Sequence, residues 1–164
     1  PVLTRIEPDQ QDQINALILQ SKAHWGYDAP MMEKMAQVLR VDLDAAAQGR
    51  AIAGWLNGSP IGMAQVTTPY EDNRGRAMEL ELLFIAPQAI GTGLGRQLYL
   101  WALDQAHASE ANRLEILSDP FARGFYTAMG ASFIEDRPSK LIPGRTLPWL
   151  EHRLASSGSN FLPK

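Results

Sequence analysis

The sequence contains no cysteine. A disulfide framework, a thiol nucleophile and a cysteine-ligated metal site are therefore excluded. The chain also has no run of about 18 apolar residues, so we expect no segment that spans a membrane. The first ten residues, PVLTRIEPDQ, lack the basic start and the apolar core of a signal peptide. A cytoplasmic location is the default expectation.

Neither sign of charge dominates the chain. Lysine and arginine contribute 15 positive charges and the acidic residues 18 negative ones, which gives a formal net charge of -3. Because the basic residues are scattered, we expect no nucleic-acid partner. The three histidines, His24, His107 and His152, show no metal-ligand spacing, and we expect no metal.

What the chain does have is an ordinary globular composition. Its 164 residues are 45% hydrophobic and 20% charged, which suits one folded domain with its own core. We expect a single domain over residues 1–155 and a flexible C-terminal tail over residues 156–164.

The apolar periodicity predicts an alternation of strands and helices. The predicted order is strand, two helices, three strands, helix, strand, helix and two strands, which places the chain in the α/β (α+β) class. Asn57-Gly58 between two apolar runs predicts a hairpin. Residues 70–76 are predicted as a loop, and residues 42–48 as a linker or a short helical turn. We expect strand 113–117 to run parallel to strand 77–85, because a helix connects them.

Residues 78–96, MELELLFIAPQAIGTGLGR, have the order strand, glycine loop, helix. Gly91, Gly93 and Gly95 let the backbone approach a bulky ligand, and the free N–H groups of the helix start favour an anion such as pyrophosphate. The spacing fits neither a dinucleotide fingerprint nor a P-loop, because Arg96 stands where each needs a glycine.

Residues 84–95, FIAPQAIGTGLG, resemble the acetyl-CoA loop of the GNAT N-acetyltransferase superfamily, Arg/Gln-x-x-Gly-x-Gly/Ala after a strand that ends hydrophobic-x-Pro. Ile90 departs from this pattern, since the family usually has Arg or Gln there. Residues 122–131 resemble a second GNAT segment, Ala-x-x-Phe-Tyr-x-x-x-Gly-Phe, with Ala131 in place of the usual aromatic and Asp119 where the family often has Asn. The order of elements agrees over residues 2–154.

Three further segments resemble a bacterial GNAT subgroup with no secure substrate. They are SKAHWGYD at residues 21–28, SDP at residues 118–120 and IPGRTLP at residues 142–148.

The resemblance implies the GNAT fold, a mixed central sheet of about six to seven strands flanked by about four helices. It implies an acyltransferase that uses acetyl-CoA as co-substrate and acetylates a primary amine of a small or amino-acid-like molecule. Because no cysteine exists to carry an acyl intermediate, we expect direct attack in a ternary complex. The residues expected to bind the cofactor are Phe84, Ile85, Gly91, Thr92, Gly93, Leu94, Gly95, Arg96, Asp119 and Phe125. Arg96 is alternatively a solvated helix residue, and Phe125 a packing residue.

Acyl transfer needs a base for the amine and an acid for the leaving thiolate. Glu79 and Glu81 share one face of the strand by period-two alternation, and burial with mutual repulsion would raise one pKa. The family often places its base at one of these positions; we favour Glu81, with Glu79 second. The alternative is an ion pair with a surface Arg or Lys. Tyr126 is the acid that the resemblance implies, and otherwise a core aromatic.

His24, Trp25 and Tyr27 are the expected acceptor-site residues, since the loop between the first two helices borders that site in relatives. An aromatic pair can hold a cationic amine, or Trp25 can plug the space between helices. The rival functions are a non-catalytic or regulatory acyl-CoA-binding module and an acetylase of a peptide or protein amine. The loop at residues 135–147 caps the acceptor site or carries a strand exchanged in a homodimer.

Overall fold

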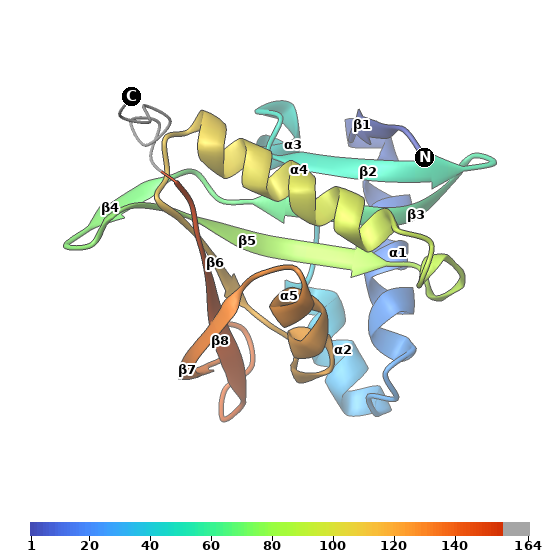
Figure 1. Ribbon diagram of the computed structural model, residues 1–164. Helices are drawn as coiled ribbons and strands as arrows, with labels where there is room; N and C mark the ends of the chain where they lie inside the picture. The colour runs from blue at the N-terminus through green and yellow to red at the C-terminus, as the bar shows by residue number, and fades with distance from the viewer. Residues whose placement is uncertain (156–164) are drawn as a thin grey trace.

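A mixed sheet of eight strands runs through residues 1–155, the part of the chain that the computed structural model describes (Figure 1). The strands are β1 (Leu3–Arg5), β2 (Ala51–Leu56), β3 (Ser59–Val66), β4 (Tyr70–Asp72), β5 (Gly75–Ile85), β6 (Arg113–Leu117), β7 (Ser132–Pro138) and β8 (Thr146–Arg153). The helices are α1 (Gln11–Ala23), α2 (Ala29–Val38), α3 (Leu43–Ala47), α4 (Leu94–Ala108) and α5 (Arg123–Ala128), with 3-10 turns η1 (Pro8–Gln10), η2 (Pro87–Ala89) and η3 (Pro120–Ala122).

The strand order is β1-β2-β3-β5-β6-β8-β7, and β4 pairs with β5. Strands β5 and β6 are parallel, as the helix between them predicts, and the neighbouring pairs β3–β5 and β6–β8 are antiparallel. The predicted hairpin at Asn57-Gly58 is confirmed between β2 and β3, with positive φ at both residues.

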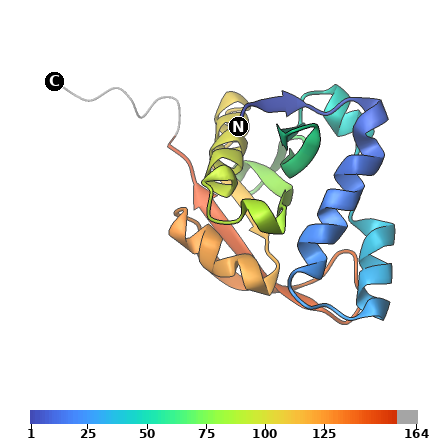
Figure 2. The same ribbon diagram turned by 90° about the vertical axis from the view of Figure 1, so that its right-hand side faces the viewer.

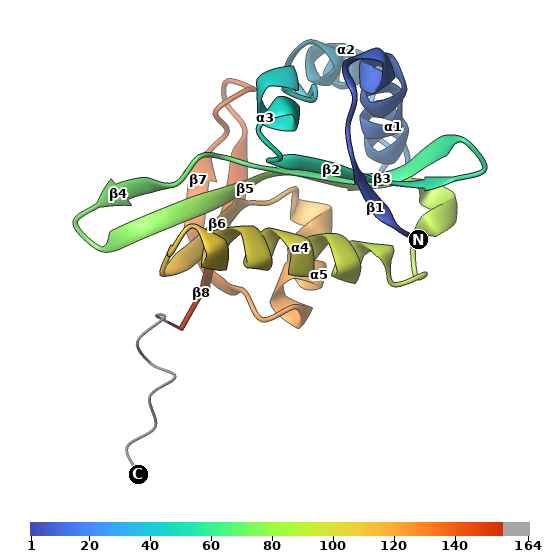
Figure 3. The same cartoon turned by 90° about the horizontal axis from the view of Figure 1, so that it is seen from above.

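Helices cover both faces of the sheet. Figure 3 shows α1, α2 and α3 above it and α4 and α5 below it. Ile14 and Ile18 of α1 and Leu98 of α4 are fully buried and belong to one core cluster that includes the sheet's apolar side chains. Seen from the side, the loop between β7 and β8 reaches the lower ends of α1 and α2 (Figure 2). Segments far apart in sequence therefore meet at this end of the molecule.

Two strand glycines let α4 lie close to the sheet. A Cβ atom at Gly62 would stand 2.7 Å from a methyl carbon of Leu94 and 3.1 Å from one of Leu98. A Cβ atom at Gly54 would stand 3.2 Å from Leu94. The first turn of α4 is thus packed directly on β2 and β3, which fixes the position of the loop before it.

Strands β5 and β6 separate partway along their length. Their pairing joins Ala77–Leu80 of β5 to Arg113–Ile116 of β6, while β5 continues to Ile85 against β3. Beyond Leu80, the edge of β5 that faces β6 therefore has no strand partner. This opening positions the candidate site.

The expected numbers of strands and helices were slightly too low. Residues 70–76, predicted as a loop, form β4 and the start of β5, and the predicted linker at 42–48 contains α3. Strand β4 consists of three exposed residues, Tyr-Glu-Asp, and shows no alternation of apolar and polar side chains. Its pairing with β5 could therefore not be predicted from the sequence pattern. The expected loop at 135–147 is also shorter, because β7 extends to Pro138 and β8 begins at Thr146.

In the described part of the chain, each helix is too short or too polar to cross a membrane. The predicted tail at residues 156–164 lies outside the described residues.

Candidate functional site

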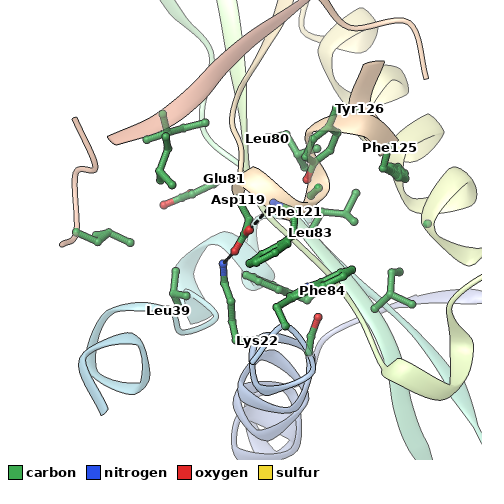
Figure 4. A pocket seen from close by; sticks show the side chains of 18 of the residues that line it. Lys22, Leu39, Leu80, Glu81, Leu83, Phe84, Asp119, Phe121, Phe125 and Tyr126 are labelled. Atoms are coloured by element: carbon green, nitrogen blue, oxygen red, sulfur yellow. Dashed lines mark hydrogen bonds and ion pairs between the residues drawn. The ribbon is translucent and has the colours of Figure 1, made fainter. Parts of the chain in front are cut away.

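A cavity of about 510 Å³ occupies the opening between β5 and β6 (Figure 4). On the side of α4 and α5 it is lined by the glycine loop and α5; on the side of α1 it is lined by α1, the start of η3 and the loop before β8. The cavity thus connects the two layers of helices through the sheet, and we call its two ends the α4 side and the α1 side.

The glycine loop forms the α4 side. Gly91 and Gly93 have φ of 81° and 89°, and nothing lies within 4 Å of a Cβ position at either residue. Gly93 is the N-cap of α4. The first helical N–H with a backbone acceptor is that of Gln97, which donates to the Gly93 carbonyl at 3.0 Å. Within residues 1–155, the preceding N–H groups from Gly93 to Arg96 donate to no protein acceptor. They are free to bind an anion, as the sequence predicts.

Five of the residues that the sequence assigns to the cofactor line this part of the cavity: Ile85, Gly91, Gly93, Gly95 and Arg96. Phe84 lines the cavity on the α1 side, where Lys22 Nζ lies 5.6 Å from the centroid of its ring. Thr92 and Leu94 do not line it. The Thr92 hydroxyl donates to the Ala89 carbonyl at 2.6 Å, and the Leu94 side chain is buried in the core, so only their backbone groups are available to a ligand.

Tyr126 points from α5 toward the cavity (Figure 4) and is 6% exposed. Its ring packs against Phe125 and Tyr99, with ring centroids 5.3 and 6.0 Å away. In the described residues its hydroxyl has no hydrogen-bond partner. Burial raises its pKa, so the phenol keeps its proton near neutral pH and can donate it. Phe125 also lines the cavity, and it is close to Gly95, where a Cβ atom would meet its ring at 3.2 Å.

The two glutamates of β5 lie on the α1 side in different environments. Glu81 is exposed to the cavity, and its carboxylate accepts a hydrogen bond from Gln65 Nε2 at 3.2 Å. Glu79 is buried and pairs with Lys140 Nζ at 3.0 Å. Burial raises the pKa of Glu79, Lys140 opposes this shift, and the negative charge of Glu81 adds to it. The predicted ion pair is therefore present at Glu79.

Gln65 is a site residue that the sequence did not indicate. Its side chain is 1% exposed, and its Oε1 accepts the backbone N–H of Asp42 at 2.9 Å. This fixes the amide so that Nε2 faces Glu81. An apolar strand pattern carries no signal for such a contact.

Asp119 joins three segments of the chain. Its Oδ1 accepts the N–H of Phe121 at 2.8 Å, which caps η3, and its Oδ2 accepts Lys22 Nζ and the Tyr27 hydroxyl, each at 2.6 Å. Figure 4 shows the contact with Lys22 inside the cavity. The Arg145 Nη2 donates to the same Tyr27 hydroxyl at 2.6 Å. Both oxygens of Asp119 are thus bonded to protein groups, and its role toward the cofactor stays a prediction.

Lys22 and Arg145 are further residues that were missed. Both line the cavity, and both belong to the segments at 21–28 and 142–148 that resemble a GNAT subgroup. That resemblance was the available signal, since the contact spans 97 residues of sequence between Lys22 and Asp119.

Of the three aromatic-segment residues expected at the acceptor site, Trp25 lines the cavity and His24 does not. The exposed His24 is the C-cap of α1, and its ring meets that of Trp25 at a steep angle with ring centroids 5.0 Å apart. Tyr27 lies behind the lining, because its hydroxyl is held by Asp119 and Arg145. Trp25 stacks on Phe121 at 5.4 Å with the rings nearly parallel.

The loop between β7 and β8 covers the α1 side. Ser139, Lys140, Leu141, Ile142 and Arg145 all line the cavity. The geometry agrees with the capping alternative for this loop. Among residues 1–155, no group of three or more potential metal ligands comes together.

Comparison with known proteins identifies the family. The Acetyltransferase (GNAT) family matches residues 17–131 of this chain, and the chain belongs to that family of acyltransferases. No curated protein matched the chain in a sequence comparison.

Solved structures share the fold at low sequence identity. A GCN5-related N-acetyltransferase from Rhodopseudomonas palustris is 19% identical with a TM-score of 0.72, over 94% of this chain and 96% of the other. The PaiA N-acetyltransferase from Thermoplasma acidophilum, in complex with coenzyme A, is 12% identical with a TM-score of 0.71, over 93% and 98%. N-acetylglutamate synthase from Neisseria gonorrhoeae, complexed with coenzyme A and N-acetyl-glutamate, is 18% identical with a TM-score of 0.67, over 94% of this chain and 35% of that one. The expected GNAT fold is confirmed.

Proposed function

We propose that the protein is an acetyl-CoA-dependent N-acetyltransferase that acts on a primary amine of a small molecule by direct attack in a ternary complex. One observation carries the proposal. A single cavity through the sheet holds the free N–H groups of the glycine loop and Tyr126 on the α4 side and Glu81 on the α1 side. A donor and an acceptor that enter from opposite faces can therefore meet between β5 and β6.

The residues of the α4 side fit coenzyme A. Free N–H groups at the start of α4 suit its diphosphate, and Arg96 adds a positive charge. The unpaired edge of β5 at Phe84 and Ile85 can bond a pantetheine arm as an added strand does. Two of the structural neighbours named above hold coenzyme A, which supports this assignment. Bound acetyl-CoA supplies an acetyl thioester.

The chain provides two groups for proton transfer. Glu81, exposed in the cavity and held by Gln65, takes a proton from the acceptor ammonium directly or through a water. Tyr126, which keeps its proton because of its burial, donates it to the leaving thiolate. The absence of cysteine is consistent with direct attack, because no thiol can carry the acetyl group between the two substrates.

The covered α1 side supports a small acceptor over a protein amine. The hydrogen bond from Arg145 to Tyr27 ties the β7–β8 loop to the loop after α1, and the ion pair of Lys140 with Glu79 ties the same loop to β5. A protein N-terminus would need an open groove at this place.

The test is release of free coenzyme A from acetyl-CoA with a panel of amines. We expect turnover with at least one amine, and a loss of about 10²- to 10⁴-fold in kcat in Tyr126→Phe and in Glu81→Gln. The matched control is Tyr70→Phe, because Tyr70 bonds Glu115 away from the cavity lining. Tight binding of coenzyme A without turnover across the panel would instead identify a non-catalytic binding module.

A further inference from the structure

Three segments that are distant in sequence meet in one polar cluster on the α1 side of the cavity. Lys22 comes from α1 and Tyr27 from the loop after it, Asp119 lies between β6 and η3, and Arg145 belongs to the loop before β8. Lys22 Nζ and the Tyr27 hydroxyl contact Asp119 Oδ2, and Arg145 Nη2 lies 3.8 Å from the same oxygen. We call these four residues the Asp119 cluster.

The Asp119 cluster carries an excess positive charge. The Lys22 ammonium and the Arg145 guanidinium share one carboxylate. Burial lowers the pKa of Lys22 and the charge of Asp119 opposes this shift. Tyr27 is neutral, because burial raises its pKa to about 12. The side chains of Lys22, Asp119 and Arg145 are only 9%, 10% and 17% exposed. A buried positive charge without its own counter-charge is costly, and an anion in the cavity would remove that cost.

An excess negative charge lies at Glu81. The charge of Glu79, two residues earlier on the same strand, is balanced by its ion pair with Lys140. Glu81 has a neutral partner, Gln65, and forms no ion pair with any described residue. The α1 side therefore holds one uncompensated negative charge at the proposed base and one uncompensated positive charge at the Asp119 cluster.

The walls between and around these charges are largely apolar. Leu39, Ile142 and Leu147 line the cavity, and Trp25 and Phe121 stack at its edge. Such walls favour the hydrocarbon part of a ligand and strengthen charge recognition inside the cavity by keeping water away.

From this arrangement we propose that the acceptor is an amino acid with an apolar side chain, whose carboxylate binds Arg145 and Lys22 while its amine lies at Glu81. The inference rests on the proposed function and names the substrate class of the same site. The two charges of a zwitterionic acceptor match the two uncompensated charges of the cavity, and a guanidinium binds a carboxylate through directed hydrogen bonds.

A phosphate of coenzyme A is the other anion that could occupy the Asp119 cluster. Lys22 belongs to α1, on the opposite face of the sheet from the start of α4, where the glycine loop offers its free N–H groups (Figure 3). The acceptor's carboxylate is the better match, because Arg145 and Lys22 share the α1 side with Glu81.

The experiment compares α-amino acids with their decarboxylated amines, for example L-leucine with 3-methylbutylamine and L-phenylalanine with 2-phenylethylamine. For the amino acid of the panel that reacts faster, we expect kcat/KM to exceed that of its decarboxylated amine by about ten- to a hundredfold. A charge-assisted contact with the carboxylate would give a ratio of this size. In Arg145→Gln this ratio falls to near one through a higher KM for the amino acid, and Arg145→Lys restores part of it.

The ratio separates binding of a carboxylate from a structural role, because a loosened loop would affect both members of a pair alike. Arg153→Gln is the matched control, since Arg153 is 85% exposed and pairs with Glu151 outside the cavity lining; it keeps the wild-type ratio. If Arg145→Gln does not fold, two measurements on the wild type test the carboxylate site. The amino acid must be preferred over its amine, and 3-phenylpropanoate must inhibit amine acetylation competitively.

Three outcomes would overturn the inference. Equal kcat/KM for amino acids and their amines leaves acetyl transfer intact and removes the carboxylate site. An Arg145→Gln enzyme with a higher KM for acetyl-CoA and an unchanged ratio assigns the Asp119 cluster to the cofactor. Binding of coenzyme A with no turnover of any amine refutes the proposed function, and this inference with it.

Discussion

At the scale of single residues, the site combines side chains whose protonation is controlled by burial. Tyr126 is held in its protonated form, and Glu79 is shifted toward its protonated form although Lys140 opposes the shift. Glu81 lies two residues further along the same strand and opens to the cavity. Two glutamates on one face of β5 thus differ in protonation behaviour, because Glu79 is buried and Glu81 is exposed to the cavity.

Glu79 should cost stability at neutral pH. Its folded-state pKa is raised above its unfolded value, chiefly by burial, so the folded state is favoured by protonation and the cost appears as the pH rises through that folded pKa. We predict that Glu79→Gln raises the Tm at pH 7 by about 2–5 °C, and that the gain shrinks below about pH 4. Thermal unfolding across pH checks this, with Glu71→Gln on exposed β4 as the control. A lower Tm at pH 7 would mean that the bond to Lys140 outweighs burial.

His152 should make the fold sensitive to mild acid. Its Nδ1 lies 2.8 Å from the hydroxyl of buried Tyr99, and its pKa is lowered, mainly by burial and also by His107. The unfolded chain therefore takes up a proton first as the pH falls through about 6.5, and stability is lost there.

The measurement is the fall in Tm between about pH 7.5 and pH 5.5. It should be several degrees larger in the wild type than in His152→Gln, because one proton contributes at most about 1.4 kcal/mol per pH unit. His24→Gln is the matched control, since His24 is exposed at the end of α1. Equal pH dependence in wild type and His152→Gln would contradict the prediction.

At the scale of elements, the packing of α4 on the sheet positions the glycine loop. Gly62→Ala would push its Cβ against Leu94 and Leu98, within the first turns of α4. We predict a loss of about 1–3 kcal/mol in the free energy of unfolding, which is typical of overpacking, and a higher Kd for coenzyme A because the loop shifts with the helix.

Gly124→Ala provides the control for Gly62→Ala. Gly124 lies in α5, and nothing stands within 4 Å of a Cβ at this position, so alanine should leave stability unchanged or raise it by up to about 1 kcal/mol. Denaturant unfolding gives both values. If Gly62→Ala and Gly124→Ala had the same free energy of unfolding, the prediction that α4 packs too closely on β3 for a side chain at Gly62 would be wrong.

The elements that could be predicted from sequence are those whose signal is local. The glycine loop, the parallel pair β5–β6 and the hairpin at Asn57-Gly58 each follow from a short pattern of spacing and turn residues. Strand β4 could not be predicted, because its three exposed polar residues pair with β5 without burying an apolar face.

The same distinction applies to the site. Glu81 and Tyr126 lie in or beside local motifs, whereas Lys22, Gln65 and Arg145 reach the cavity through contacts between distant segments. Nothing in periodicity reports such partners. His24, expected at the acceptor site, lies at the C-terminal end of α1 outside the cavity lining, whereas its neighbour Trp25 lines the cavity.

At the scale of the whole molecule, bound coenzyme A should hold together the two layers of helices on either face of the sheet. The cavity is lined by residues from both helical layers, so coenzyme A is expected to stabilise the fold. With free ligand at about 100 times its Kd, the gain is about 2.7 kcal/mol, which is a rise of roughly 5 °C or more in Tm.

Gly93→Val should abolish this stabilisation by coenzyme A. Its φ of 89° strains a β-branched side chain, and the free N–H groups of the loop move with it. Gly58→Val is the matched control, because Gly58 has φ of 80° in the β2–β3 hairpin and open space around it. Both variants should lose basal stability, but only Gly58→Val should keep the rise in Tm with coenzyme A. A full rise in Gly93→Val would refute phosphate binding by this loop.

Beyond Leu80, the edge of β5 that faces β6 has no strand partner. When the cavity holds no substrate, the peptide groups on this edge can form hydrogen bonds only with water. Hydrogen–deuterium exchange reads this directly. The amides on that edge should exchange quickly in the isolated protein, far faster than those that bond β3, and should become protected only when a ligand backbone lies along the strand. The protein would then complete its own sheet with its substrate in each catalytic cycle.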